Sequence, residues 1–102
     1  MELRWRPLNM PLSIETTVSI VNQRGLHARA AAKIVAAATP FDAEITIAHD
    51  RQTANAKSIL GLMMLAASQG SELQITASGS DAEAAAMAIK MLMESGFHEP
   101  PE

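Results

Sequence analysis

The sequence predicts an α+β domain in which three helices cover one face of a four-stranded antiparallel sheet, an open-faced sandwich. Two observations point to this fold class: some stretches alternate apolar and polar residues, and others repeat apolar residues at helical spacing. The elements follow in the order strand, helix, strand, strand, helix, strand, helix. Strands that are polar on one face suit an antiparallel sheet covered on one side, because parallel sheets are usually buried on both faces.

Three of the expected strands alternate apolar and polar side chains, as a strand with one buried face does. They are residues 15–21, 43–48 and 71–77. In the first of them, Val18 and Ile20 share the face that we expect to be buried. A turn at Asp50 leaves room for a short fourth strand at residues 52–55.

The first two expected helices carry apolar residues at intervals of three and four. The first begins close to Ala28 and ends before Pro40. The second follows Ser58, a residue type that is favoured at the N-cap of a helix. We expect its core face to consist of Ile59, Leu62, Met63 and Ala66.

The third expected helix opens with Ser80 and Glu83 at the spacing of a capping box and ends at Gly96. Most of the methionines fall at helical spacing in this helix and the one before it, so we expect the majority of them to lie in the core. The methionines concerned are Met63, Met64, Met87, Met91 and Met93.

The length and composition suit one domain, which we place at residues 13–97. A chain of 102 residues with 48% hydrophobic content buries roughly 60 to 70% of its unfolded surface. Residues 1–12 contain bulky and structure-discouraging side chains, and we interpret them as an N-terminal extension. We expect residues 98–102 to form a loose tail.

The composition excludes several classes of function. The lack of cysteine excludes disulfides and thiolate metal sites and fits the cytoplasm. A net charge of −3 and three aromatic residues argue against a nucleic-acid surface, and no apolar run reaches the roughly 20 residues of a membrane span. His49 and His98 lack the spacing and the neighbouring carboxylates of a metal site. We therefore expect two solvated side chains, no metal and no cofactor.

The stretch "RGLHARAAAK", residues 24–33, places a histidine at the start of the first expected helix. If that helix begins close to Ala28, His27 is its N-cap and Gly25 supplies the turn before it. The first N–H groups of a helix have no internal partners and attract an anion such as phosphate. Arg29 can add a charge-assisted contact, so a phosphate held by Ala28 and Arg29 would lie beside the imidazole nucleophile.

His27 can also be interpreted as an ordinary polar cap. In that case the chain would be a non-catalytic α+β module that binds a small ligand or a protein. The sequence shows no second acid or base near His27, as an autonomous enzyme would need, and no cluster of metal ligands for a hydrolase. The enzyme class therefore stays open, and a carrier that other enzymes load and unload is favoured.

Two motifs, together with the order of the elements, resemble the HPr phosphocarriers of the phosphoenolpyruvate-dependent phosphotransferase system. They are "GLHAR" at 25–29 and "NAKSILGLMMLAASQG" at 55–70, and the resemblance covers residues 14–97. It implies that His27 accepts a phosphoryl group from phosphorylated enzyme I and passes it to an EIIA-type acceptor. It also implies that Arg29 steadies the phosphate, and that the fold is the HPr-like open-faced β-sandwich of a monomer.

One set of stretches suggests a branch of that family, and one residue departs from the family pattern. The stretches "FDAEITI", "MMLAASQG" and "ESGF" look more like the nitrogen-related HPr homologue than the sugar-transport type, which implies a regulatory acceptor. Ala30 stands where the family usually has proline. Proline stiffens a first helical turn, whereas alanine returns one N–H donor, so we expect a less rigid loop and unchanged chemistry.

The second expected helix carries two further implications of the resemblance. The family has a regulatory phosphoserine at the position of Ser58, which makes HPr kinase/phosphorylase a candidate partner. The N-cap role alone would also explain a serine at this position. The family also docks its partners through the first two helices. Here the corresponding docking residues are Ile59, Leu60 and Met63. From the sequence alone, Leu60, Met64 and Ala67 form an additional apolar set that the core does not need, although a fully buried helix would show the same pattern.

Overall fold

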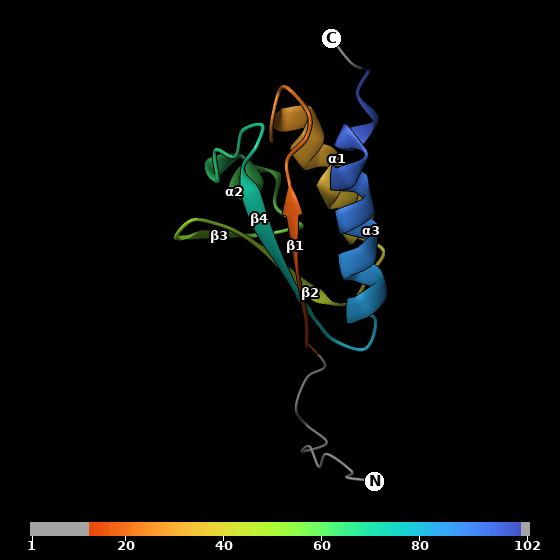
Figure 1. Ribbon diagram of the computed structural model, residues 1–102. Helices are drawn as coiled ribbons and strands as arrows, with labels where there is room; N and C mark the ends of the chain where they lie inside the picture. Colours follow the sequence, from red (N-terminus) through yellow and green to blue (C-terminus); the bar gives the residue numbers. More distant parts are fainter. Residues whose placement is uncertain (1–12, 101–102) are drawn as a thin grey trace, which may run out of the picture.

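Residues 13–100 of the computed structural model are described here, and they fold into four strands, three α-helices and one short 3₁₀ segment (Figure 1). In chain order these are β1 (Ser13–Ser19), α1 (Ala28–Ala38), β2 (Glu44–His49), β3 (Gln52–Asn55), α2 (Ile59–Met64), β4 (Glu72–Ser78), α3 (Ala82–Glu94) and η1 (Gly96–His98). The predicted order of elements is confirmed. The expected extension at residues 1–12 lies outside the described residues.

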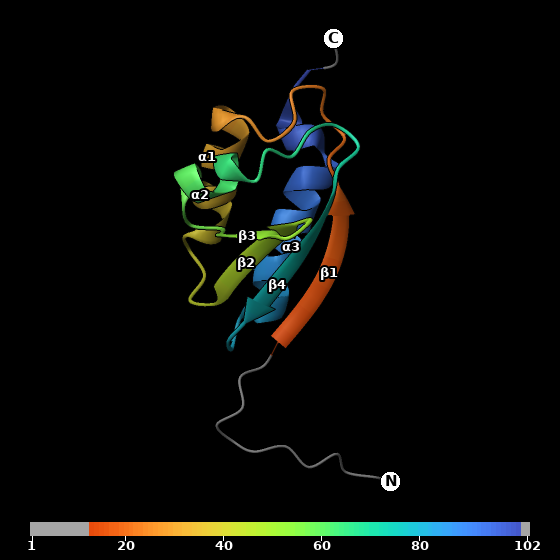
Figure 2. The same cartoon turned by 90° about the vertical axis from the view of Figure 1, so that its left-hand side faces the viewer.

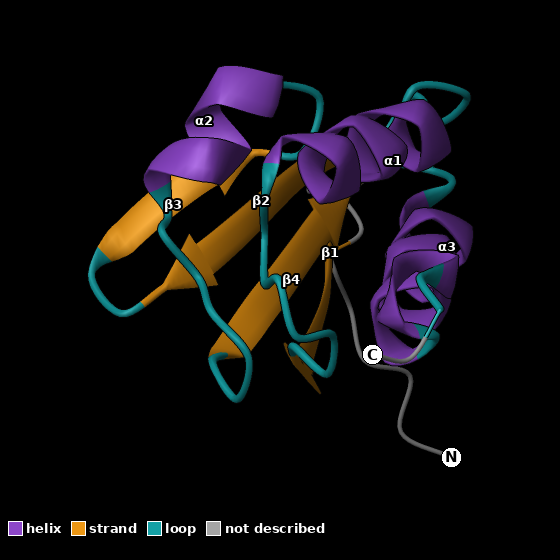
Figure 3. Ribbon diagram, turned by 90° about the horizontal axis from the view of Figure 1, so that it is seen from above, coloured by secondary structure: helices purple, strands orange, loops and turns teal. Residues whose placement is uncertain are grey.

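The four strands form one antiparallel sheet in the order β1-β4-β2-β3. Ile75 at the centre of β4 pairs with Thr16 of β1 on one side and with Ile47 of β2 on the other. The three helices cover one face of this sheet, as the view from above shows (Figure 3). The α+β class and the open-faced arrangement predicted from the alternating strands are therefore confirmed.

The core lies between the sheet and the helices. The apolar residues on one face of the sheet are buried, and so is Ile20 directly after β1; the strand residues are Val18, Ile45, Ile47, Leu73, Ile75 and Ala77. β1 begins and ends two residues earlier than expected, and Val21 is exposed rather than part of the strand. On the helices the core face consists largely of alanine, with Ala30, Ala31 and Ala38 fully buried in α1. Such small side chains let the helices lie close to the sheet and to each other.

The expected core face of α2 is wrong at three of its four positions. Only Leu62 is buried within the helix, while Ile59, Met63 and Ala66 are exposed. The reason is the length of α2, which has six residues and ends at Met64. The chain then turns, with a positive φ of 52° at Ala66, and its next buried side chains are Leu65 and Ala67.

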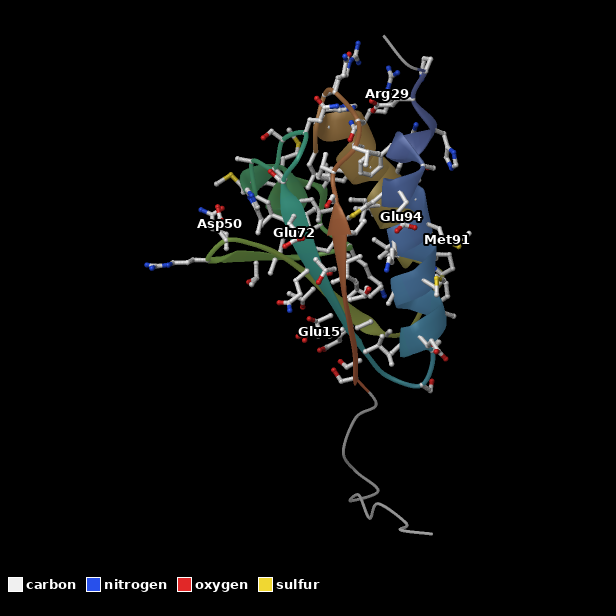
Figure 4. The ribbon with its side chains drawn as sticks, viewed as in Figure 1. Glu15, Arg29, Asp50, Glu72, Met91 and Glu94 are labelled. Atoms are coloured by element: carbon white, nitrogen blue, oxygen red, sulfur yellow. The ribbon has the colours of Figure 1, made fainter. Side chains whose placement is uncertain are left out.

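The methionines are also mostly outside the core, contrary to expectation. Of the five in α2 and α3, Met93 alone is buried, and Met91 points away from the molecule on the outer side of α3 (Figure 4). Alanines and Ile89 already fill the inner face of α3, so the methionines one or two positions along the helix face the solvent.

The predicted capping box of Ser80 and Glu83 is not formed. Asp81 is the N-cap residue of α3, and its carboxylate makes no bond to the helix. The two carboxylate oxygens instead accept hydrogen bonds from the backbone N–H groups of Asp42, at 2.8 Å, and Ala43, at 2.9 Å. Asp81 therefore ties the start of α3 to the segment that leads into β2.

The chain after α3 folds back on the domain. Gly96 has the positive φ, 69°, expected of a residue that ends a helix. Phe97 follows with its side chain fully buried, and the Lys33 ammonium donates a hydrogen bond to its carbonyl at 2.5 Å. The expectation of a loose tail over residues 98–102 does not account for Glu99, whose carboxylate contacts His27 and Asn22.

No helix within residues 13–100 is both long enough and apolar enough to cross a membrane.

Candidate functional site

His27 is the N-cap residue of α1, as the sequence predicts. Its backbone is extended, with φ −81° and ψ −179°, and its carbonyl accepts the Ala31 N–H at 2.9 Å. Its ring nitrogen Nδ1 accepts the backbone N–H of Arg29 at 3.2 Å. The Nδ1 atom therefore lies at the positive end of the helix, where backbone N–H groups attract anions.

Gly25 fixes the path of the chain into this cap. Its φ is 67°, and a Cβ at this position would lie 2.6 Å from the carbonyl oxygen of Ala67. Only glycine fits such a backbone contact, which lets Leu26 donate its N–H to the same carbonyl at 2.9 Å. The loop before α1 is thus bound to the loop that follows α2.

The second ring nitrogen of His27 has a carboxylate partner that the sequence analysis missed. The Nε2 atom lies 2.5 Å from Oε2 of Glu99, and Asn22 donates its Nδ2–H to Oε1 of the same carboxylate at 3.1 Å. The hydrogen bond with His27 lowers the pKa of Glu99 from its ordinary value. Burial opposes this shift, and the Asn22 hydrogen bond and the positive charge of Arg24 add to it. With Glu99 ionised, Nε2 is the donor and carries the proton.

Arg29 lies beside this carboxylate at the surface. Its side chain is exposed, and Figure 4 shows it at the end of the molecule where the chain leaves α3. A shallow groove brings Arg29 together with the residues around Glu99. Its lining includes Asn22, Gln23, Arg24, Arg29, Gln69 and Glu99. Ala28 is also exposed, so the first turn of α1 is open to an anion from solvent.

The second helix packs against α1 and exposes several apolar residues. Figure 2 shows α1 and α2 side by side. Four neighbouring apolar side chains of α2 are exposed, Leu60 most of all with 72% of its surface, and we call them the α2 patch. The α2 patch consists of Ile59, Leu60, Met63 and Met64. Ala67, which the sequence placed in this exposed set, is buried.

Ser58 is the N-cap residue of α2, as predicted. Its Oγ accepts the backbone N–H of Gly61 at 3.0 Å, and its side chain is partly exposed beside Ile59. The hydroxyl thus has a complete structural role, and it is also within reach of another protein.

The other two histidines are His49 and His98. His49 is not solvated as expected, because its side chain is only 17% exposed and its Nδ1 lies 2.8 Å from the Leu65 carbonyl. His98 is exposed. Among residues 13–100, no group of three or more histidine and acidic side chains is placed to hold a metal ion.

Residues 14–95 match the family model described as the PTS HPr component phosphorylation site. The chain belongs to the HPr family of phosphocarrier proteins. It is 47% identical to phosphocarrier protein HPr of Treponema pallidum over 83 residues, which are 81% of this chain and 94% of that protein. It is 45% identical to phosphocarrier protein NPr of Shewanella violacea over 86 residues, 84% of this chain and 94% of the relative.

Solved structures agree with this membership. The crystal structure of HPr-C-His from Thermoanaerobacter tengcongensis superposes with a TM-score of 0.81 at 44% identity. The superposition covers 85% of this chain and 98% of the other. A phosphocarrier role in the phosphotransferase system follows from the family, and relatives named HPr and NPr match at nearly equal identity.

Proposed function

We propose that His27 carries the phosphoryl group of this HPr-family phosphocarrier, receiving it from phosphorylated enzyme I and passing it to an EIIA-type acceptor in the cytoplasm. The observation that supports this most is the position of His27 as N-cap of α1, with Nδ1 directed at the first backbone N–H groups. A nucleophilic nitrogen and an anion site lie in one place there.

In the proposed transfer, His27 Nδ1 first releases the Arg29 N–H that it accepts in this structure, and its lone pair then forms the new bond to phosphorus. The bond between phosphorus and the donor nitrogen breaks, and its electron pair stays with the donor. The N–H groups of Ala28 and Arg29 at the start of α1, together with the Arg29 guanidinium, stabilise the negative oxygens. The acceptor then reverses these steps, so the chain is regenerated rather than acting as an autonomous enzyme.

The partners dock on the α2 patch in this proposal. The patch is apolar, exposed and on a helix adjacent to α1, which suits contact with a protein that delivers a phosphoryl group to His27. A regulatory EIIA-like acceptor follows from the resemblance to the nitrogen-related branch. The near-equal identity to relatives named HPr and NPr leaves that choice to experiment.

Ser58 is a proposed regulatory site for HPr kinase/phosphorylase. A phosphate on its hydroxyl would lie at the N-terminus of α2, where the helix dipole favours negative charge. The same charge would stand beside Ile59 and Leu60, so a partner docking on the α2 patch would meet new negative charge at a desolvated surface.

The alternative is a non-catalytic module in which His27 is only a polar cap. Incubation with labelled phosphoenolpyruvate and a cognate enzyme I separates the two functions. The phosphocarrier takes up covalent label that is lost in acid and kept in alkali, as expected of a phosphorus–nitrogen bond. A chain that binds enzyme I but never acquires covalent label would support the binding module.

A further inference from the structure

We propose that Glu99, itself held by Asn22, is a positioning residue for His27: it keeps the proton on Nε2, so that Nδ1, which accepts the Arg29 N–H in this structure, has the lone pair that attacks the phosphoryl donor. This inference rests on the proposed function of His27. It gives a role in phosphoryl transfer to Glu99, which lies in the segment that the sequence predicts to be a loose tail.

The contact has the geometry of a carboxylate that orients a histidine. Glu99 Oε2 lies 2.5 Å from Nε2, while Nδ1, on the opposite side of the ring, lies 3.2 Å from the Arg29 N–H. An ionised carboxylate only accepts hydrogen bonds, so Nε2 must be the protonated nitrogen in the neutral ring. In catalytic triads and metal sites, carboxylates fix the tautomer and orientation of a histidine in this way.

Asn22 holds the carboxylate from the other side. It is 7% exposed, and its Nδ2 donates both to Glu99 Oε1, at 3.1 Å, and to the Gly25 carbonyl, at 2.9 Å. The opposite orientation of the amide would bring two oxygens together at each of these contacts. With Nδ2 making both bonds, the Oδ1 atom is buried with no partner among residues 13–100.

Glu99 is also anchored through the chain before it. The side chain of Phe97, two residues earlier, is fully buried. The Lys33 ammonium bonds the Phe97 carbonyl. Figure 1 shows the end of α3 and the loop before α1 next to each other at one end of the molecule. The packing of Phe97 thus sets the position of Glu99.

The carboxylate also has an electrostatic task in the transfer. As Nδ1 bonds to phosphorus and keeps no free lone pair, the ring becomes an imidazolium with its proton still on Nε2. The Glu99 charge stabilises that cation as it forms, in a site partly shielded from water. When the acceptor removes the phosphoryl group, the Nδ1 lone pair is restored and the proton has not moved.

The first test needs no partner protein. In the full chain labelled with ¹⁵N-histidine, the Nε2 proton of His27 gives a resolved signal protected from exchange with water. Glu99→Ala loses that signal, whereas Glu94→Ala, which removes an exposed carboxylate from α3, keeps it. His49 is an internal reference, because its contact with the Leu65 carbonyl requires the proton on Nδ1. An unchanged His27 signal in Glu99→Ala would overturn the proposal.

The second test measures phosphoryl acceptance from phosphoramidate, a small donor that docks on no protein surface. Its phosphorus–nitrogen bond breaks as His27 attacks, and ammonia leaves. Glu99→Ala should accept label more slowly by about 10- to 100-fold, the loss typical when a carboxylate that orients a histidine is removed. Glu99→Gln keeps an oxygen for Nε2 without the charge, so its rate should lie between those of Glu99→Ala and the native chain.

Failure of the two proposals can be told apart in this assay. A native chain that takes no label on His27 would refute the proposed function. A native chain that is labelled at the same rate as a folded Glu99→Ala variant would refute the positioning role alone. Asn22→Ala is a poorer test, because Asn22 also bonds the Gly25 carbonyl and its loss could unfold the loop.

Discussion

The two ring nitrogens of His27 have different surroundings, and this difference determines which of them can react with a phosphoryl group. Nδ1 lies at the exposed N-terminus of α1, where it accepts the Arg29 N–H. Nε2 is hydrogen-bonded to the carboxylate of Glu99. A phosphoryl group arriving from solvent therefore meets Nδ1 and the positive end of the helix together.

Arg29 is the first test at the scale of single residues. Arg29→Ala should slow phosphoryl acceptance by about tenfold or more, because a hydrogen bond to a charged group is worth about 1.5 kcal/mol or more. The melting curve should not change, since the side chain is exposed and the backbone bond to Nδ1 remains. Arg51→Ala, at an exposed turn, is the matched control. Equal rates for both variants would mean that the backbone N–H groups stabilise the phosphoryl group without help from the Arg29 side chain.

Glu99 provides a test through pH. Its pKa is lowered in the folded chain by His27, with Asn22 and Arg24 contributing, so the contact stabilises the fold above the ordinary pKa of glutamate, about 4.3. That contribution is lost as the pH falls through the lowered pKa. Unfolding by denaturant at pH 6 and pH 3 should show Glu99→Gln less stable than the native chain at pH 6, with a smaller difference at pH 3.

The same measurement on Glu94→Gln controls for the loss of one carboxylate. A difference between native and Glu99→Gln that is as large at pH 3 as at pH 6 would mean that the Glu99 charge contributes nothing to stability.

Residue by residue, the sequence predicts one half of the site and misses the other. His27, Gly25 and Arg29 lie within five consecutive residues, so local rules for helix starts suffice to find them. Glu99 is 72 residues from His27, and its place depends on the burial of Phe97. A large apolar residue directly after the glycine that ends α3 was the available signal.

At the scale of elements, α2 is the part that depends most on a single cap. It has six residues and buries only Leu62, so the bond from Gly61 to the Ser58 hydroxyl matters more than in a long helix. Its shortness also explains why the α2 patch is exposed, since fewer than two turns cannot turn all of these side chains toward the sheet.

Substitutions at Ser58 separate the cap from the proposed regulation. Ser58→Ala should lower the free energy of unfolding by about 1 kcal/mol, because the Gly61 N–H loses its acceptor, and should leave transfer from enzyme I unchanged. Ser58→Asp keeps a cap, so its melting temperature should stay nearly native, but its phosphorylation by enzyme I should be slower. A folded Ser58→Asp chain that accepts phosphate at the native rate would leave Ser58 as a cap alone.

The sequence predicts which elements exist better than how they end. Alternation finds three of the four strands, and the turn at Asp50 predicts the fourth, β3, whose bounds at Gln52–Asn55 agree with the expectation. The capping box at α3 is not formed because Asp81, between the two residues chosen, is the N-cap, and its carboxylate accepts the N–H groups of Asp42 and Ala43 before β2. The methionines were misplaced because helical spacing does not reveal that alanine and isoleucine already fill the inner face of α3.

At the scale of the whole molecule, three distant segments meet at one end of the sheet. The loop before α1, the loop after α2 and the chain after α3 are joined there by the Leu26–Ala67 and His27–Glu99 contacts (Figure 1). The helix that carries the α2 patch packs against α1, so the proposed docking and transfer would use neighbouring elements. Local patterns alone predict neither contact, because each requires the complete fold.

The docking surface is tested by charge on exposed positions. Leu60→Glu should slow transfer from enzyme I while phosphoryl acceptance from phosphoramidate and the melting curve stay native, because Leu60 is 72% exposed. Met91→Glu is the matched control, an exposed apolar residue on the outer side of α3 (Figure 4). Equal enzyme I rates in the two folded variants would remove the α2 patch from the account.

The central claim, that His27 carries the phosphoryl group, is tested most directly by labelling single-histidine variants. With labelled phosphoenolpyruvate and enzyme I, His27→Ala should take up no acid-labile label, while His49→Ala and His98→Ala should be labelled to the native extent. The reason is that only His27 stands at the N-terminus of a helix beside an exposed arginine. Acid-labile label that persists in a folded His27→Ala chain would contradict the account.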